Sequence, residues 1–390
     1  MKYRRCFPSF CAAVAVFCVS SAVACVDGGA SLTRAEAEQR AQQLWEQYAA
    51  AIREQRAAEL NAMLVRAGEH DMKLLRKDFG EKPEGGRSLW ISMHGGGGTA
   101  AEVNDQQWQN QIRLYEPTEG IYLAPRAPSN EWHLWHREEI DRLFDRLIES
   151  AILAWDVDPD RVYLLGYSAG GDGVYQLAPR MADRFAAAAM MAGHPNDASP
   201  LGLRNLPFAI FMGANDGAYN RNKVAAEWGE QLAALREADA EGYPHLVTIY
   251  EGLGHWMQGR DREALPWMAR HTRSAWPRRV VWKQGNALHP RFYWLAVDEA
   301  DAARGRTIIA TVRDQTIELE SAEINRVELL LHDALIDLDQ PIVVKANNAV
   351  VFEGIVKRRE DAMKRSLMLR ADPRSIATAR VHVSWEKAAQ

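Results

Sequence analysis

Cysteine is almost absent from this chain of 390 residues. Its four cysteines all lie within the first 25 residues, at Cys6, Cys11, Cys18 and Cys25. The rest of the chain therefore has no cysteine pair that could form an internal disulfide, and it must rely on its core for stability.

An excess of basic residues is missing too. The chain has 47 Lys and Arg against 52 Asp and Glu, a net charge of −5, and no basic stripe. Nucleic acid is therefore not an expected partner. The hydrophobic fraction of 47% and the charged fraction of 25% are ordinary for a globular protein. At this length, two domains are the default expectation.

The N-terminus lacks an apolar run long enough to cross a membrane comfortably, because its run covers only residues 10–19. Three basic residues precede this run, and Ala22-Val23-Ala24 follows it as a small-x-small cleavage site. This layout predicts a signal peptide over residues 1–24. The protein would be exported, periplasmic or secreted, with no integral membrane span.

Cys25 would stand directly after that cleavage site, so a lipid anchor at Cys25 is the alternative to a plain cleaved signal peptide. Bacterial lipoproteins usually place Leu three residues before the modified cysteine, and this chain has Ala22 there. The plain signal peptide is therefore the favoured prediction.

Residues 25–85 are expected to form a helical N-terminal segment. Residues 33–66 are rich in Ala, Glu, Gln, Arg and Leu and contain neither Pro nor Gly. The sequence Glu-Lys-Pro-Glu-Gly-Gly at 81–86 then marks a turn-rich break.

Residues 86–277 alternate short apolar runs with helical patterns. The expected strands are 88–93, 120–123, 161–165, 186–191, 207–212 and 246–250, and the expected helices are 138–154, 170–181 and 224–238. This alternation predicts an α/β domain with a doubly wound, mostly parallel sheet covered by helices on both faces.

Residues 278–390 change to a mainly β pattern after Trp276-Pro277. The expected strands are 280–283, 292–297, 307–312, 316–319, 327–331, 342–345, 350–352 and 379–385, with a short helix at 360–369. Asn347-Asn348 predicts a hairpin turn, because Asn tolerates positive φ. The pattern indicates a second, β-rich domain, built as a small sandwich.

The sequence Gly-Tyr-Ser-Ala-Gly at 166–170 is a G-x-S-x-G element that directly follows an apolar strand and precedes a helix. This strand–turn–helix setting is the context of a nucleophile elbow, which presents a serine on a strained turn. We therefore expect Ser168 to be a nucleophile, with the N–H of Ala169 turned toward a developing oxyanion.

The glycine-rich segment His94–Thr99 also follows a strand. Glycines there would offer backbone N–H groups to a substrate carbonyl without side-chain crowding, so Gly96 and then Gly97 are the expected oxyanion donors beside Ala169. His94 is expected to shape this loop. A phosphate-binding loop is disfavoured, because no Gly-Lys-Ser/Thr follows.

An acid and a base should follow the serine in the order Ser, Asp or Glu, His. Asp216 directly follows the strand predicted at 207–212, and His255 directly follows the strand at 246–250. Weaker candidates for the acid are Asp172, Asp197, Asp239 and Glu251. The order predicts a triad of Ser168, Asp216 and His255 that forms an acyl-enzyme.

His94–Thr99, Gly166–Gly171, Gly213–Asp216 and Gly254–His255 together resemble the esterase-type α/β hydrolases. The nearest branch is the exported bacterial group of polyhydroxybutyrate depolymerases, feruloyl esterases and dienelactone-hydrolase-like enzymes. The resemblance covers residues 86–275 and implies hydrolysis of small-molecule or polymer esters without a cofactor. The chain departs from the disulfide-bearing members, and it adds a β-rich C-terminal domain that many of them lack.

Residues for substrate binding are harder to select. Trp132, Trp256 and His194 are the best candidates because they stand beside these motifs, although a Trp is more often buried in a core. No metal site is expected. His133 and His136 stand near two glutamates, but they lack a recognisable ligand spacing.

Two alternatives stay open. A serine peptidase of the prolyl-oligopeptidase type uses the same triad on the same fold. The C-terminal domain could also bind a polymer through Trp282, Trp294 and Trp385, although simple packing on the catalytic domain is the preferred interpretation.

Overall fold

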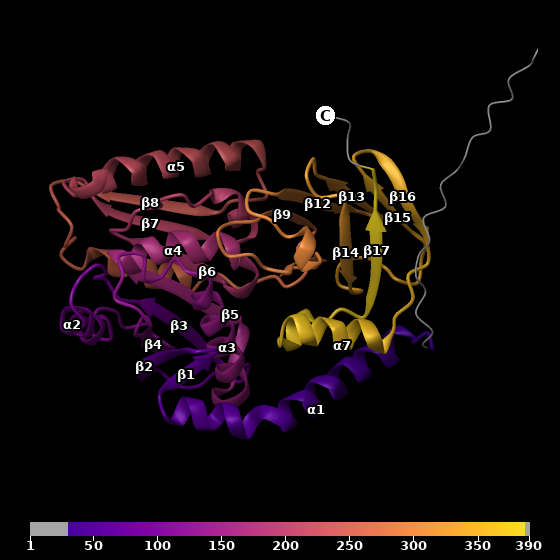
Figure 1. Cartoon of the computed structure of the whole chain (residues 1–390), viewed down its shortest axis with the longest axis horizontal. Helices are drawn as coiled ribbons and strands as arrows, with labels where there is room; N and C mark the ends of the chain where they lie inside the picture. The colour runs from indigo at the N-terminus through magenta and orange to yellow at the C-terminus, as the bar shows by residue number, and fades with distance from the viewer. Residues whose placement is uncertain (1–29, 387–390) are drawn as a thin grey trace, which may run out of the picture.

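The computed structural model describes residues 30–386 (Figure 1). The predicted signal peptide and Cys25 lie outside the described residues. Within residues 30–386, no helix has the length and apolar character that a membrane crossing needs.

The part of the chain that carries the predicted triad, called the catalytic part below, is built on an eight-stranded sheet in the order β1-β2-β4-β3-β5-β6-β7-β8. Its strands are β1 (Leu64–Ala67), β2 (His70–Phe79), β3 (Arg87–Met93), β4 (Gly120–Pro125), β5 (Val157–Tyr167), β6 (Ala187–Met191), β7 (Phe208–Gly213) and β8 (His245–Tyr250). The six strands from β4 to β8 in this order are parallel, whereas β1 and β2 are antiparallel. This confirms the predicted doubly wound, mostly parallel sheet.

Helices cover both faces of this sheet. The α-helices in the described part of the chain are α1 (Arg34–Asn61), α2 (Ala101–Gln111), α3 (Glu138–Trp155), α4 (Ala169–Arg180), α5 (Arg221–Ala238), α6 (Ala264–Met268) and α7 (Glu360–Leu369). Buried residues of α3, α4 and α5 pack on one face, and α6 and the end of α2 pack on the other. Helix α1 runs outside α3 and reaches α7 of the C-terminal part (Figure 1).

Residues 64–79 differ from the expected helical segment. The helix ends at Asn61, and the chain then forms β1 and β2, which extend the catalytic sheet at its edge. Strand β2 buries only two of its ten side chains and carries several charges, as edge strands often do. The charges of β2 interrupt the alternation of apolar and polar residues from which a strand is predicted, so the sequence did not predict it. The sheet therefore begins at β1, earlier than the predicted domain start at residue 86.

The C-terminal part contains a four-stranded sheet, β10-β11-β14-β17, and a five-stranded sheet, β16-β15-β13-β12-β9. Its strands are β9 (Arg279–Lys283), β10 (Arg291–Phe292), β11 (Leu295–Ala296), β12 (Thr307–Arg313), β13 (Thr316–Glu320), β14 (Arg326–Leu331), β15 (Ile342–Ala346), β16 (Ala349–Gly354) and β17 (Ala379–Ser384). Asn347 and Asn348 turn between β15 and β16 with φ of 46° and 70°. The single strand expected at 292–297 is instead a short antiparallel pair.

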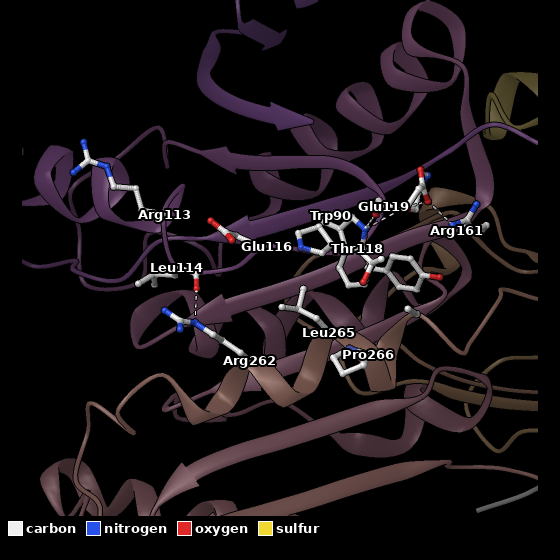
Figure 2. A pocket seen from close by; sticks show the side chains of 14 residues that line it. Trp90, Arg113, Leu114, Glu116, Thr118, Glu119, Arg161, Arg262, Leu265 and Pro266 are labelled. Atoms are coloured by element: carbon white, nitrogen blue, oxygen red, sulfur yellow. Dashed lines mark hydrogen bonds and ion pairs between the residues drawn. The ribbon is translucent and has the colours of Figure 1, made fainter. Parts of the chain in front are cut away.

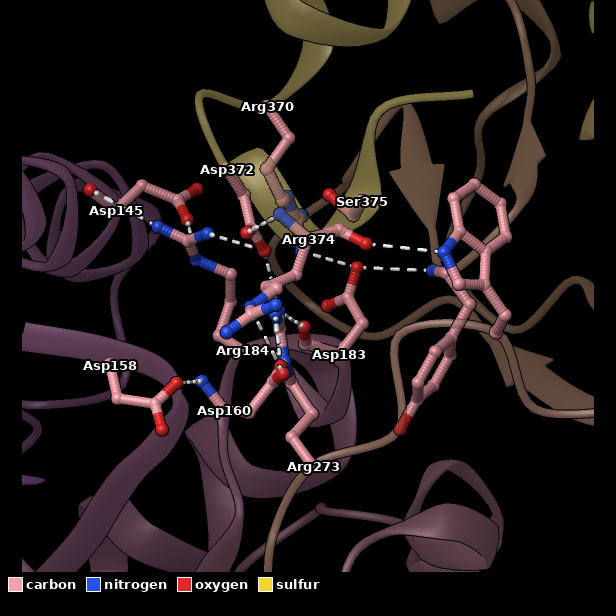
Figure 3. Close-up of polar contacts among 12 residues, drawn as sticks. Asp145, Asp158, Asp160, Asp183, Arg184, Arg273, Arg370, Asp372, Arg374 and Ser375 are labelled. Carbon is pink, nitrogen blue, oxygen red and sulfur yellow. Dashed lines mark hydrogen bonds and ion pairs between the residues drawn. The ribbon is translucent and has the colours of Figure 1, made fainter. Parts of the chain in front are cut away.

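Buried charges join the two parts (Figure 3). Asp372, which follows α7, lies 2.6 Å from Arg273 and 3.8 Å from Arg184, and Arg370 pairs with Asp183. Asp372 is fully buried. Because a buried charge is costly unless it is paired, this network fixes how the β-rich part sits on the catalytic part.

The tryptophans proposed as polymer contacts do not form an exposed surface. Trp282 and Trp294 are buried in the core, and the indole of Trp294 donates to the carbonyl of Pro277. Trp385 is half-buried and packs against the same core. The polymer-binding alternative is therefore wrong for Trp282 and Trp294, because their apolar surface is used for packing, and for Trp385 it stays a prediction.

Candidate active site

Ser168 stands on the turn between β5 and α4, with φ of 58° and ψ of −122°. A non-glycine residue rarely adopts positive φ, so the turn is strained. The N–H of Ser168 donates to the carbonyl of Met191 on β6 at 2.9 Å, which ties the turn to the neighbouring strand. The serine is thus held at the carboxyl edge of the sheet.

Glycines on either side make this turn sterically feasible. A Cβ atom on Gly166 would overlap the carbonyl of Gly170, and one on Gly170 would overlap the carbonyl of Met93 on β3. The spacing of the G-x-S-x-G element therefore follows from backbone contact between β5, α4 and β3.

The structure brings Ser168, His255 and Asp216 together. His255 Nε2 lies 3.0 Å from Ser168 Oγ, and His255 Nδ1 lies 2.6 Å from Asp216 Oδ2. Asp216 is 3% exposed, whereas the His255 side chain is 39% exposed. The buried carboxylate can hold one ring nitrogen while the other faces the serine, as acyl transfer requires.

Backbone contacts position the acid and the base. A Cβ atom on Gly213 would overlap the carbonyl of Gly254, so the loops after β7 and β8 touch. The Tyr167 hydroxyl donates to the carbonyl of His255 at 2.6 Å, which ties the histidine loop to the nucleophile turn. The guanidinium of Arg221 lies 3.9 Å from Asp216 Oδ1 and adds positive charge beside the acid.

The glycine loop lies against the serine. A Cβ atom on Gly95 would stand 3.1 Å from Ser168 Cβ, so this position admits little more than hydrogen. Among the described residues, the N–H of Gly96 has no hydrogen-bond partner. Ala169 is the first residue of α4, where an N–H lacks an intrahelical acceptor.

The structure corrects the prediction that Gly97 is an oxyanion donor. Its N–H donates to Asn104 Oδ1 at 2.8 Å and is therefore already used. The amide nitrogen of Asn104 donates to the carbonyls of Thr99 and Ala100, so this buried residue shapes the whole loop. Asn104 was missed because its role depends on a contact that no short motif records.

His94 also shapes the loop, as expected. Its Nε2 accepts the N–H of Ala127 at 3.1 Å, which leaves Nδ1 protonated to donate to the carbonyl of Gly95 at 2.6 Å. Burial lowers the pKa of His94 to about 4. The imidazole is therefore neutral near pH 7.

Comparisons with known proteins give no family assignment. No family model matches the chain, and no curated protein matches it. A solved thermostable esterase is 19% identical with a TM-score of 0.41, and the match covers 54% of this chain and 62% of that chain, less than two thirds of its length. A ferulic acid esterase is 18% identical, TM-score 0.35, over 51% and 98% of the two chains.

The enterobactin and salmochelin hydrolase IroE is 14% identical, TM-score 0.37, over 52% and 90% of the two chains. With TM-scores below 0.5, these likenesses carry no argument about function. The argument about function rests instead on the strand order and on the contacts of Ser168.

Exposed aromatic side chains accompany the site. Trp132 is 62% exposed and stands beside Gly98 of the glycine loop. Trp256, next to His255, is 54% exposed and packs edge-on against Tyr167. Tyr219, three residues after Asp216, is 77% exposed and lies under the guanidinium of Arg221; the sequence analysis did not select it.

The other residues considered for the triad have different partners. Asp172 accepts the backbone N–H of His194, Asp239 pairs with Arg204, and Asp197 accepts from Asn286. His194 is half-buried, and its Nδ1 accepts the N–H of Asn196. Its predicted contact with substrate stays a prediction.

A cavity of about 590 Å³ lies elsewhere, at the amino-terminal halves of β3 and β5 (Figure 2). Glu119, on its wall, pairs with Arg161 and accepts from Ser88. None of the three triad residues lines this cavity, so its size does not make it the reaction centre.

Proposed function

We propose that this protein is a serine hydrolase that cleaves carboxylic esters through an acyl-enzyme. The observation that carries the proposal is the line of contacts from Ser168 Oγ to His255 Nε2, at 3.0 Å, and from His255 Nδ1 to Asp216 Oδ2, at 2.6 Å. Each of the three residues follows a strand of the parallel sheet, in the order Ser, Asp, His that the fold requires.

In this mechanism, Ser168 Oγ attacks the acyl carbon while His255 Nε2 takes the hydroxyl proton. The N–H groups of Gly96 and Ala169 receive the oxyanion. The intermediate collapses, and His255 returns the proton to the leaving alcohol. Water, activated by His255, then attacks the acyl-enzyme, releases the acid and restores Ser168. Asp216 holds the Nδ1–H tautomer throughout.

Esters are favoured over amides because an alcohol is a better leaving group than an amine at the same triad. The alternative, a serine peptidase, is tested below with an aminoacyl arylamide. Within residues 30–386 the additional domain consists of two small sheets, which is not a propeller of the prolyl-oligopeptidase kind. Export, with cleavage after Ala24, belongs to the proposal as a separate expectation.

The test compares wild type with Ser168→Ala on p-nitrophenyl acetate, a methyl hydroxycinnamate, acetylated xylan and an aminoacyl arylamide. Wild type should hydrolyse at least one ester, and Ser168→Ala should lose about 10⁴- to 10⁶-fold in kcat. Ser384→Ala, an exposed serine on β17, is the matched control and should behave as wild type.

Equal ester hydrolysis by wild type and Ser168→Ala would refute the nucleophile. Cleavage of the arylamide alone, lost in Ser168→Ala, would replace the esterase with a peptidase.

A further inference from the structure

Arg221 stands beside the triad, on a part of the chain that breaks two local rules. It is the first residue of α5, where the positive end of the helix dipole disfavours a cation. The two residues before it, Tyr219 and Asn220, have φ of 55° and 57°, a region uncommon for residues other than glycine. Such departures from local preference persist where the surrounding structure requires them, and they are expected at functional sites.

The guanidinium of Arg221 is largely buried but has no hydrogen bond. Its side chain is 15% exposed, and the ring centroid of Tyr219 lies 4.9 Å from its central carbon. Within residues 30–386, Asp216 is its only ion-pair partner, with Arg221 Nη1 3.9 Å from Asp216 Oδ1. A buried charge is costly unless it is paired, so the carboxylate of Asp216 explains why a cation is placed here.

The two oxygens of the Asp216 carboxylate face different partners. Oδ2 contacts His255 Nδ1 at 2.6 Å, whereas Oδ1 accepts no hydrogen bond from the described residues and has Arg221 beside it. At 3.9 Å the guanidinium leaves the imidazole as the group that is hydrogen-bonded to this carboxylate. The torsion that turns a carboxylate has broad minima, so a positive charge at Oδ1 helps to keep Oδ2 directed at His255.

The turn before α5 keeps Arg221 close to two acids. The N–H of Asn222 donates to the carbonyl of Asp216 at 3.1 Å, and its side-chain amide donates to the backbone of the same loop at 2.7 Å. The guanidinium also acts on Asp172 of α4. Burial raises the pKa of Asp172, whereas the hydrogen bond from the N–H of His194 and the charge of Arg221 oppose that rise.

We propose that Arg221 is a positioning residue of the triad, whose charge holds the carboxylate of Asp216 in the orientation that His255 requires. This inference deepens the proposed function and rests on it. The strained turn and the unfavourable charge at the start of α5 are then consequences of placing a guanidinium against Asp216.

The test is Arg221→Met, which removes the charge and keeps a long side chain. Two rates are measured: kcat on p-nitrophenyl acetate, and labelling by a fluorophosphonate, in which Ser168 Oγ bonds to phosphorus and fluoride leaves. Both should fall about 10- to 100-fold with little change in KM, because a misdirected catalytic group slows the reaction rather than binding. Arg221→Lys keeps the charge and should lie between the two proteins.

The matched control is Lys223→Met, which removes an exposed positive charge from the same turn of α5. It should label and turn over like wild type. An equal loss in Lys223→Met would assign the effect to the charge of the helix terminus and would overturn the proposal.

A double-mutant cycle shows whether Arg221 acts through Asp216. When Asp216→Asn has already replaced the carboxylate by an amide, adding Arg221→Met should change the labelling rate by less than about twofold, because no carboxylate remains to orient. Labelling is stoichiometric, so slow variants stay measurable. A loss of the same factor in both backgrounds would give Arg221 a purely structural role and would overturn the proposal.

Unchanged rates in Arg221→Met would also overturn it, while leaving the esterase proposal intact. So would a raised KM confined to mono-p-nitrophenyl succinate, an ester with a negatively charged acyl group, because Arg221 would then be a substrate contact. Arg221→Gln provides a second uncharged variant if the melting temperature shows that Arg221→Met does not fold.

The esterase proposal fails separately, if Ser168→Ala keeps full activity on p-nitrophenyl acetate. The contact between His255 and Asp216 is still judged in that event by the proton NMR signal of the hydrogen at Nδ1, identified by its absence in Asp216→Asn. This signal should broaden or disappear in Arg221→Met, and an unchanged signal would overturn the positioning role.

Discussion

Asp216 and Asp372 are both almost completely buried, yet they are held in opposite ways. Asp216, 3% exposed, contacts the imidazole of His255, whose side chain is 39% exposed. Asp372, fully buried, lies between Arg273 and Arg184, which are themselves buried (Figure 3).

The difference follows from what each partner can do. A guanidinium stays charged at any pH that a protein meets, so Arg273 and Arg184 form a permanent attachment between two parts of the chain. The imidazole of His255 is a base that reaches the surface, where a substrate can meet it. Thus a buried carboxylate serves chemistry when its partner is an accessible base, and it serves structure when its partner is a buried permanent charge.

The largest expected effect comes from a substitution of Asp216, and it tests whether this buried carboxylate serves catalysis. Asp216→Asn should lower kcat for ester hydrolysis by about 10⁴-fold, because an amide favours the wrong imidazole tautomer. The folded structure should persist, since the shape of the side chain is kept. The measurement is kcat on a p-nitrophenyl ester together with the melting temperature. A loss of folding in place of a loss of turnover would make Asp216 a structural residue like Asp372.

The second largest effect comes from a substitution of Asp372, and it tests whether this buried carboxylate serves stability. Burial alone would raise the pKa of Asp372, but the charges of Arg273 and Arg184 outweigh burial and hold the pKa well below its ordinary value. Asp372→Asn leaves buried guanidinium charge uncompensated, so the free energy of unfolding should fall by about 3–5 kcal/mol. Urea denaturation measures this. Turnover per folded molecule should stay near wild type, and a 10⁴-fold loss there would contradict the assignment.

Much of the catalytic part is predictable from the sequence because its signals are local. The elbow at Ser168 needs small residues at fixed spacing, and the buried parallel strands are continuous apolar runs. Asp216 and His255 could be selected because strand ends of a parallel sheet meet at one edge. The turn at Asn347 and Asn348 is local in the same way.

The residues that escaped prediction act through contacts between distant segments. Asn104 holds the N–H of Gly97 from the start of α2, and its sequence neighbours are ordinary helix formers. The charges of β2 conceal an edge strand. Trp282 and Trp294 show the converse, since a sequence rich in tryptophan does not reveal which of them face solvent.

His94 completes the comparison, because it is a buried ionisable group with neither a permanent counter-charge nor access to solvent. Burial lowers its pKa to about 4, against about 6.5 in an unfolded chain. Between these values the unfolded chain binds the additional proton, so stability is fully present above pH 6.5 and is lost as the pH falls toward 4. From these two pKa values, the contribution of His94 makes the free energy of unfolding about 2 kcal/mol lower at pH 5 than at pH 7.

Urea denaturation of wild type and His94→Gln at both pH values isolates this share, because glutamine cannot titrate while its oxygen can still accept the N–H of Ala127. The variant should be less stable at pH 7 but should lose about 2 kcal/mol less than wild type on acidification. His136, whose pKa burial also lowers to about 4, contributes equally to both proteins and cancels in the difference. The same loss on acidification in both proteins would show that His94 reaches solvent or a counter-charge, and the glycine loop would then be held by Asn104 alone.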